Sequence, residues 1–191
     1  MAKFNSWQWL VGASYIERNI AFLSNLIDEQ IGIEAGHARD LEVIWLRPAG
    51  SRWGSTPDLP DALANLRGTL RRKFSKESKI RSSLLIPNVV RTENNRRYDR
   101  IFDEAFVAPS GHLSPAVEVL LVRGVAAVVL VTATIAKSTC VPVGFATVNA
   151  VAVNLIEERL NLSFRTRAET LWKKAMQEDV QEVPSVDIAV Q

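Results

Sequence analysis

The hydrophobic pattern predicts a chain built mostly of helices. Its clearest stripe covers residues 59–74, where large apolar side chains recur at i, i+4, i+7, i+11 and i+15: Leu59, Leu63, Leu66, Leu70 and Phe74. This spacing places all five on one side of a helix. Arg67, Arg71 and Arg72 fall off the stripe, so we expect them to face water or a partner.

Two further helices are predicted before this one. Apolar residues continue at near-helical spacing over residues 7–27. A second helix covers residues 41–45 and has to end before Pro48, because proline cannot continue a helix. The stretch Pro48–Pro60 is rich in glycine, proline and serine and is expected to be a loop.

The most apolar stretch, Pro115–Ala136, carries only two charges, Glu118 and Arg123. Ser114 followed by proline is a good helix start, and the length of the run favours one long helix. Its many β-branched residues favour a pair of strands instead. We predict the helix, and the strand pair stays open as the alternative.

Val119–Ala136 also has the length of a membrane span. Arg123 lies inside this run, however, and no aromatic belt flanks it. A helix that is apolar all round and buried between neighbours explains the same residues. We therefore expect no membrane insertion.

The remaining elements complete a mainly α fold. We predict an extended piece at Leu84–Val90, a loop at Arg91–Arg97 and a short helix at 98–106. We also predict a long helix at Val143–Leu160, a shorter helix at Arg167–Gln177 and a polar tail at 178–191. The expected fold is a helical bundle with one or two extra helices, long loops and a loose C-terminal tail. Residues 1–177 would form a single helical domain, followed by the flexible tail 178–191.

Charge is divided unevenly along the 191 residues. Residues 65–100 contain eleven lysines and arginines against three acidic residues, a net charge of +8. Because the whole chain carries +2, the remainder carries −6. Such concentration suggests a polyanionic partner, with a solvated basic face as the alternative.

The residue types in this basic segment suit nucleic acid. Arginine forks fit phosphate oxygens, asparagines can bond sugar or base edges, and no base-reading motif accompanies them. We therefore expect sequence-independent phosphate contacts. The predicted RNA-binding residues are Arg67, Arg71, Arg72, Lys73, Arg91, Asn94, Asn95, Arg96, Arg97 and Arg100.

No pattern in the sequence points to catalysis. His37 and His112 lack the neighbouring ligands that a metal site needs, and Cys140 is the only cysteine. A single cysteine excludes a disulfide within the chain and favours a reduced, intracellular setting. Phosphate loops and nucleophile elbows are absent from the sequence. We expect a protein that is not an enzyme, with no metal and no cofactor.

Two stretches resemble the coat proteins of rod-shaped helical plant RNA viruses, the tobacco mosaic virus group and its relatives. Trp7–Trp45 is similar in layout to the first two helices of these coats. Ala146–Leu160 resembles their last long helix, and the residues that follow match the family's aromatic, Thr-Arg, glutamate and Trp positions: Phe164, Thr166, Arg167, Glu169 and Trp172.

This resemblance implies an all-helical coat protein that self-assembles in many copies into a rod and packages single-stranded RNA. Its expected location is the virion and the cytoplasm of the host cell. Two other hypotheses stay open: a small helical adaptor subunit of a nucleoprotein complex, and a membrane-associated protein anchored by residues 119–136.

Overall fold

The computed structural model describes residues 7–12, 16–33, 38, 40–47, 57–87, 101–108, 116–136, 139–160 and 166–167. Within these residues the elements, in chain order, are β1 (Trp7–Val11), α1 (Ile16–Gln30), β2 (Leu41–Leu46), α2 (Leu59–Lys73), β3 (Ile80–Pro87), β4 (Glu104–Ala108), β5 (Val117–Val122), β6 (Ala126–Ala136), β7 (Thr139–Thr147), α3 (Ala150–Leu160) and β8 (Thr166–Arg167). The fold is therefore mixed α/β, and the predicted mainly α helical bundle is wrong.

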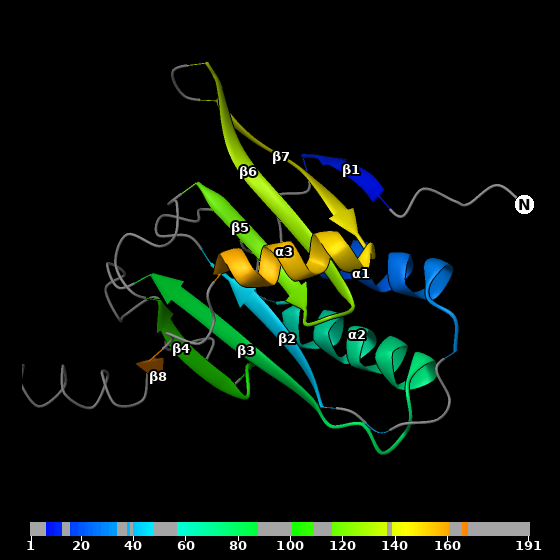
Figure 1. The fold of residues 1–191 in the computed structure, drawn as a ribbon. Coiled ribbons are helices and arrows are strands. Elements are labelled where there is room, and N and C mark those ends of the chain that lie inside the picture. Colours follow the sequence, from blue (N-terminus) through cyan, green and yellow to red (C-terminus); the bar gives the residue numbers. More distant parts are fainter. Residues whose placement is uncertain are drawn as a thin grey trace, which may run out of the picture.

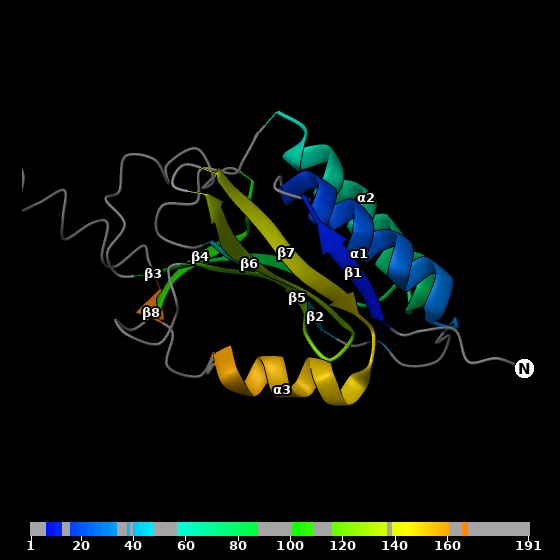
Figure 2. The ribbon, with the colours of Figure 1, turned by 90° about the horizontal axis from the view of Figure 1, so that it is seen from above.

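The strands form one sheet in the order β1-β7-β6-β5-β2-β3-β4-β8. β2, β3 and β4 are parallel to one another, whereas β5, β6, β7 and β1 extend the sheet from β2 with antiparallel pairs. Helices α1 and α2 lie side by side on one face, and α3 lies on the other (Figures 1 and 2). The described chain is thus a three-layer α/β/α arrangement in which α2 connects the parallel strands β2 and β3.

The centre of the sheet is buried on both faces. In β2, Val43 and Trp45 belong to the core beneath α1 and α2, while Ile44 and Leu46 belong to the core beneath α3. Alternate residues of a strand point to opposite faces, so a strand that is covered on both sides needs apolar residues at every position. This requirement explains why strand β2 lacks the alternation of a half-exposed strand.

The predicted helix over residues 115–136 is wrong for the same reason. This stretch forms β5 and β6, an antiparallel pair joined by a turn in which Gly124 has φ +65. Leu120 and Val122 pack beneath α1 and α2, while Val119 and Leu121 pack beneath α3. The alternative of paired strands is correct. The suggested membrane anchor 119–136 lies in these strands, and no helix in the described part of the chain is long and apolar enough to cross a membrane.

The two charges of this stretch have separate structural roles. Arg123 lies in the β5–β6 turn, where its Nη1 is 3.2 Å from Oε2 of Glu42 and its Nε donates to Oε1 of Glu157 over 2.7 Å. These contacts connect the turn to β2 on one side and to α3 on the other. The second charge, Glu118, is buried beneath α1 and α2 and is described with the functional site.

The N-terminal part of the chain also contains strands where helices were predicted. Residues 7–27, predicted as one helix, form β1 and most of α1, and Gly12 with φ +75 follows the strand. Residues 41–45, predicted as a second helix, belong to β2. In both places the apolar runs are short, so their spacing fits a strand as well as it fits a helix.

Of the other predicted elements, only two agree with the structure. The helix over residues 59–74 is confirmed by α2, and the extended piece from Leu84 agrees with β3 as far as Pro87. Residues 143–160 divide into the end of β7 and α3. Residues 101–106, the described part of the predicted helix 98–106, are a turn followed by the start of β4. The predicted loop Arg91–Arg97, the residues after Arg167 and the tail 178–191 lie outside the described residues.

One glycine is required by the close approach of β6 and β7. A Cβ added at Gly144 would lie 1.8 Å from the backbone oxygen of Val129, which is far inside van der Waals contact. At Gly68, in the middle of α2, the nearest atom to an added Cβ is Nη1 of Arg72 at 3.9 Å. The first position cannot accept a side chain unless the strands move, whereas the second has room.

We predict that Gly144→Ala lowers the free energy of unfolding by about 1–3 kcal/mol or more, because the strand backbone has to shift. Gly68→Ala should raise it by roughly 0.5–1 kcal/mol, since alanine loses less entropy in a helix. Urea unfolding followed by circular dichroism measures both. Equal effects at the two positions would contradict the strand register described above.

Candidate functional site

Arg67, the first of the predicted RNA-binding residues, has a structural role. Its Nη2 donates to Oδ2 of Asp103 and to Oγ of Ser82, each over 2.7 Å. The same carboxylate oxygen accepts the backbone N–H of Ser82 over 2.7 Å. The three residues connect α2 to β3 and to the residue before β4, so this guanidinium is already engaged within the fold.

The next predicted cations lie at the C-terminal end of α2. Nζ of Lys73 donates to the backbone oxygen of Asp28 over 2.6 Å, and the side chains of Arg72 and Lys73 lie 3.6 and 3.5 Å from the Asp28 carboxylate. Arg71 is exposed and makes no ion pair with any described residue. Positive charge here also complements the partial negative charge of the helix end.

The structure adds cations that lie next to this helix end. Helix α2 runs back across β2 and β3, so its last turn lies beside the residues that lead into β3 (Figure 1). The exposed cations gathered there are Arg71, Arg72, Lys76, Lys79 and Arg81. We call this group the basic edge. Arg81 faces Asp40 at 3.6 Å, with both side chains largely exposed, a geometry that contributes little to stability.

The other predicted RNA-binding residues are Arg91, Asn94, Asn95, Arg96, Arg97 and Arg100, and all of them lie outside the described residues. His37, His112 and the side chain of Cys140 also lie outside them. Among the described residues, no group of three or more histidine, cysteine, aspartate or glutamate side chains could hold a metal ion.

Sequence reasoning missed a buried carboxyl at the carboxyl end of β2. Glu118 of β5 is only 7% exposed, and its Oε1 accepts a 2.8 Å hydrogen bond from the indole N–H of Trp45. The ring of Phe102 lies 5.9 Å from that of Trp45, centroid to centroid. A lone glutamate in an apolar run was the available signal, because a charge is retained there only with a specific partner.

Burial raises the pKa of the Glu118 carboxyl from its ordinary value of 4.5 to about 7. The Trp45 hydrogen bond and the nearby Arg47 act in the lowering direction, and Glu17 adds to the rise. The pKa of Glu17 is also raised, by burial and by Asp58, while its own backbone N–H acts in the lowering direction. Acidic groups therefore gather where α1 and α2 begin.

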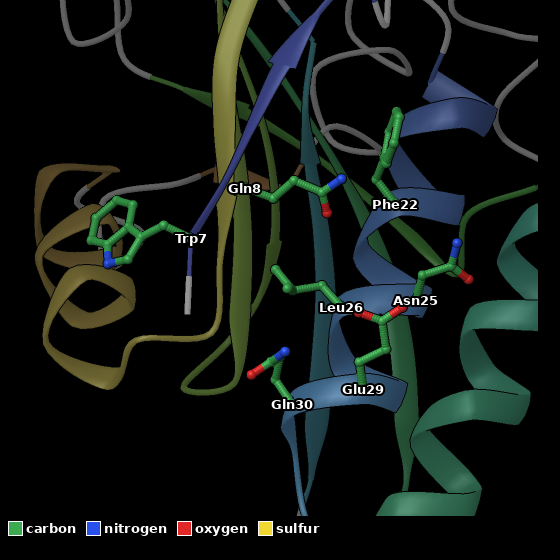
Figure 3. A pocket seen from close by; sticks show the side chains of 7 residues that line it. All are labelled: Trp7, Gln8, Phe22, Asn25, Leu26, Glu29 and Gln30. Atoms are coloured by element: carbon green, nitrogen blue, oxygen red, sulfur yellow. The ribbon is translucent and has the colours of Figure 1, made fainter. Parts of the chain in front are cut away.

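Two clefts border helix α1. One, of about 570 Å³, follows the groove between α1 and α2, from Glu17, Asp58 and Asp61 at its acidic end to Arg72 at its basic end. The other, of about 410 Å³, lies between α1 and β1 (Figure 3). Its walls are Trp7 and Gln8 from the strand and Phe22, Asn25, Leu26, Glu29 and Gln30 from the helix.

No protein-family model matches the sequence, and no curated protein matches it. Among solved structures, the chain is similar to TrmBL2, described as an archaeal chromatin protein with a novel mode of DNA binding. The two share 12% sequence identity with a TM-score of 0.46, and the match covers 91% of this chain and 55% of TrmBL2. This chain thus spans about half of the length of TrmBL2, and a likeness at this level carries no conclusion about function.

The resemblance to rod-shaped virus coats is overturned by the fold. Such coats are all-helical, whereas Trp7–Trp45 forms β1, α1 and β2, and the end of β7 lies where the last long helix was expected to begin. The expected coat function, the helical adaptor and the membrane anchor depended on helices that are strands here, and all three are wrong.

The contacts of Arg67 predict a clear difference between two aspartates. Asp103→Ala should lower the free energy of unfolding by about 1–2 kcal/mol, because it removes the carboxylate oxygen that accepts from both Arg67 and the Ser82 N–H. Asp40→Ala should change it by less than about 0.5 kcal/mol, since its pair with Arg81 is exposed. Urea denaturation compares the two. Equal losses would show that Asp103 has no special role.

The raised pKa of Glu118 predicts a loss of stability as the pH rises. The unfolded carboxyl ionises near 4.5 and the folded one near 7, so the folded state binds the extra proton between these values. Stability from this group is therefore complete below pH 4.5 and lost progressively up to pH 7, on the order of 3 kcal/mol.

Glu118→Gln should remove this part of the pH dependence, because a neutral amide oxygen still accepts the Trp45 hydrogen bond. The variant should match the wild type near pH 4 and exceed its free energy of unfolding near pH 8. Denaturation at a series of pH values measures the difference, with Glu158→Gln, an exposed position on α3, as the control. Parallel profiles for wild type and Glu118→Gln would contradict the assignment.

Proposed function

We propose that this protein binds nucleic acid through the phosphate backbone, without catalysing a reaction on it, and that the basic edge is part of the contact surface. The observation that carries the proposal is the gathering of five exposed cations where α2 ends and β3 begins. Arg71, Lys76 and Lys79 make no ion pair with any described residue, so their charges are available to a partner.

The balance of charge around the basic edge supports an anionic partner. Residues 67–81 contain seven cations and a single acid, Glu77. Three neighbouring aspartates pair with members of this set, Asp28, Asp40 and Asp103, which still leaves an excess of three positive charges. A backbone phosphate needs only such charge and hydrogen-bond donors, so the same surface can accept DNA or single-stranded RNA.

The arginines that follow in sequence extend the proposal. Four arginines continue the basic segment in the sequence beyond β3, and their charge is the ground on which we propose that they also contact phosphate: Arg91, Arg96, Arg97 and Arg100. Arg67 is left out, because its guanidinium is engaged with Asp103 and Ser82. The proposed interface therefore includes fewer residues of α2 than the sequence predicted, and it adds residues up to the start of β3.

Binding should follow the salt dependence of counterion release. We expect the logarithm of the association constant to fall linearly with the logarithm of the salt concentration, with a slope of about −0.9 per phosphate contacted on duplex DNA. Arg71→Ala combined with Lys76→Ala should reduce the size of that slope by up to about 2. Fluorescence anisotropy with a labelled DNA duplex and a labelled single-stranded RNA of equal length, each in two unrelated sequences, measures this.

The matched control is Arg18→Ala combined with Arg159→Ala, which removes the same charge from the first turn of α1 and the last turn of α3. Its slope should stay at the wild-type value. Charge reversal at Arg96 and Arg97 tests the sequence-assigned part of the surface separately. The proposal is wrong if neither nucleic acid binds at low salt, or if the basic-edge and control variants lose binding equally.

A further inference from the structure

Among the described strands, β1 forms an edge of the sheet. There it pairs only with β7, in a register that places Trp9 opposite Phe145 and Val11 opposite Val143. No described strand lies on its other side, and the 410 Å³ cleft against α1 borders it there (Figure 3). The outward backbone groups of β1 therefore face no strand among the described residues.

One face of β1 is unusually apolar for an exposed edge. Trp7, Trp9 and Val11 are 44%, 78% and 72% exposed and, as alternate residues, share the face opposite α1. Leu10, which points to the α1 side, is 2% exposed. Helix α3 crosses β5 and β6 on the same face as the tryptophans and does not extend over β1 (Figure 1).

The edge also lacks the usual protection against pairing. Natural edge strands carry charges, prolines or bulges that prevent another strand from adding. The sequence of β1, WQWLV, contains no charge and no proline, and its pairing with β7 runs without a bulge over all five residues. An uncharged strand can pair with a copy of itself without repulsion between like charges.

We propose that two copies of this protein pair through their β1 strands in an antiparallel, two-fold symmetric dimer with Trp9 on the axis. Only this register pairs all five residues of the strand with their counterparts. It places Trp9 of one copy directly opposite Trp9 of the other. Trp7 of each copy then lies opposite Val11 of the other, and all these side chains share one face. The contact is isologous, so it closes at two copies and leads to no filament.

The area available suits a weak dimer. The exposed parts of Trp7, Trp9 and Val11 amount to roughly 300–400 Å² per copy, taking about 150–250 Å² for a whole aromatic side chain. Side chains stand perpendicular to a sheet, so lateral pairing covers only the sides of these residues that meet across the axis, together with the paired backbone of the strand. The buried area therefore stays below the roughly 1,000 Å² of a stable interface, in the range of weak association.

Disulfide trapping tests the register. In a Cys140→Ser background, Trp9→Cys places two thiols at directly opposed positions, where the Cα atoms of an antiparallel pair lie about 4.5–5.5 Å apart and a disulfide can form. Trp7→Cys or Val11→Cys alone places the equivalent thiols roughly 13 Å apart. Under mild oxidation we expect the Trp9→Cys variant to form disulfide-linked dimers rapidly. The Trp7→Cys and Val11→Cys variants should cross-link little when each is alone, and a mixture of the two should cross-link rapidly again.

Sedimentation of nucleic-acid-free protein tests the association itself. The wild type should be dimeric at tens of micromolar, and Trp9→Glu should weaken association at least tenfold, because it places two like charges together on the axis. Val151→Glu, at another exposed apolar position on α3, should leave the dimer intact. A monomeric wild type, equal cross-linking at 7, 9 and 11, or a dimer disrupted only by Val151→Glu would each overturn the proposal.

Discussion

Coverage of the central sheet on both faces is the constraint on which the rest of this structure depends. Lateral strand pairing satisfies the backbone groups, and helices on either side cover the side chains, so the middle strands can be apolar at every position. Glu118 is tolerated inside this layer because it has the Trp45 indole as a donor and a raised pKa. Where the coverage ends, at β1, apolar side chains reach the surface instead.

The same constraint explains which elements could be predicted. Helix α2 is recognisable because one side of it faces solvent, which leaves a clear stripe from Leu59 to Leu70. Strands β5 and β6 have no polar side, so periodicity could not separate them from a buried helix of the same length. The β-branched composition favoured strands, and length was the weaker criterion.

The candidate site was only partly predictable. Concentrated charge was visible in the sequence and drew attention to α2 and the residues after it. Which cations stay available depends on acids that are distant along the chain: Asp28 lies 45 residues before Lys73, and Asp103 lies 36 residues after Arg67. Such pairing follows from the packing of α1 on α2 and of β3 on β4, and neither contact is encoded in local spacing.

The two proposed surfaces lie well apart on the sheet, and their symmetry has a physical consequence. The basic edge lies at the start of β3, five strands from β1, or roughly 24 Å at the usual strand spacing. A two-fold axis through Trp9 that keeps the two sheets continuous is perpendicular to them. It therefore directs the amino ends of the two β3 strands in opposite directions. A dimer built in this way would place its two basic edges at opposite ends of the joined sheet and both α2 helices on the same face, because rotation about an axis perpendicular to the sheet does not exchange its faces.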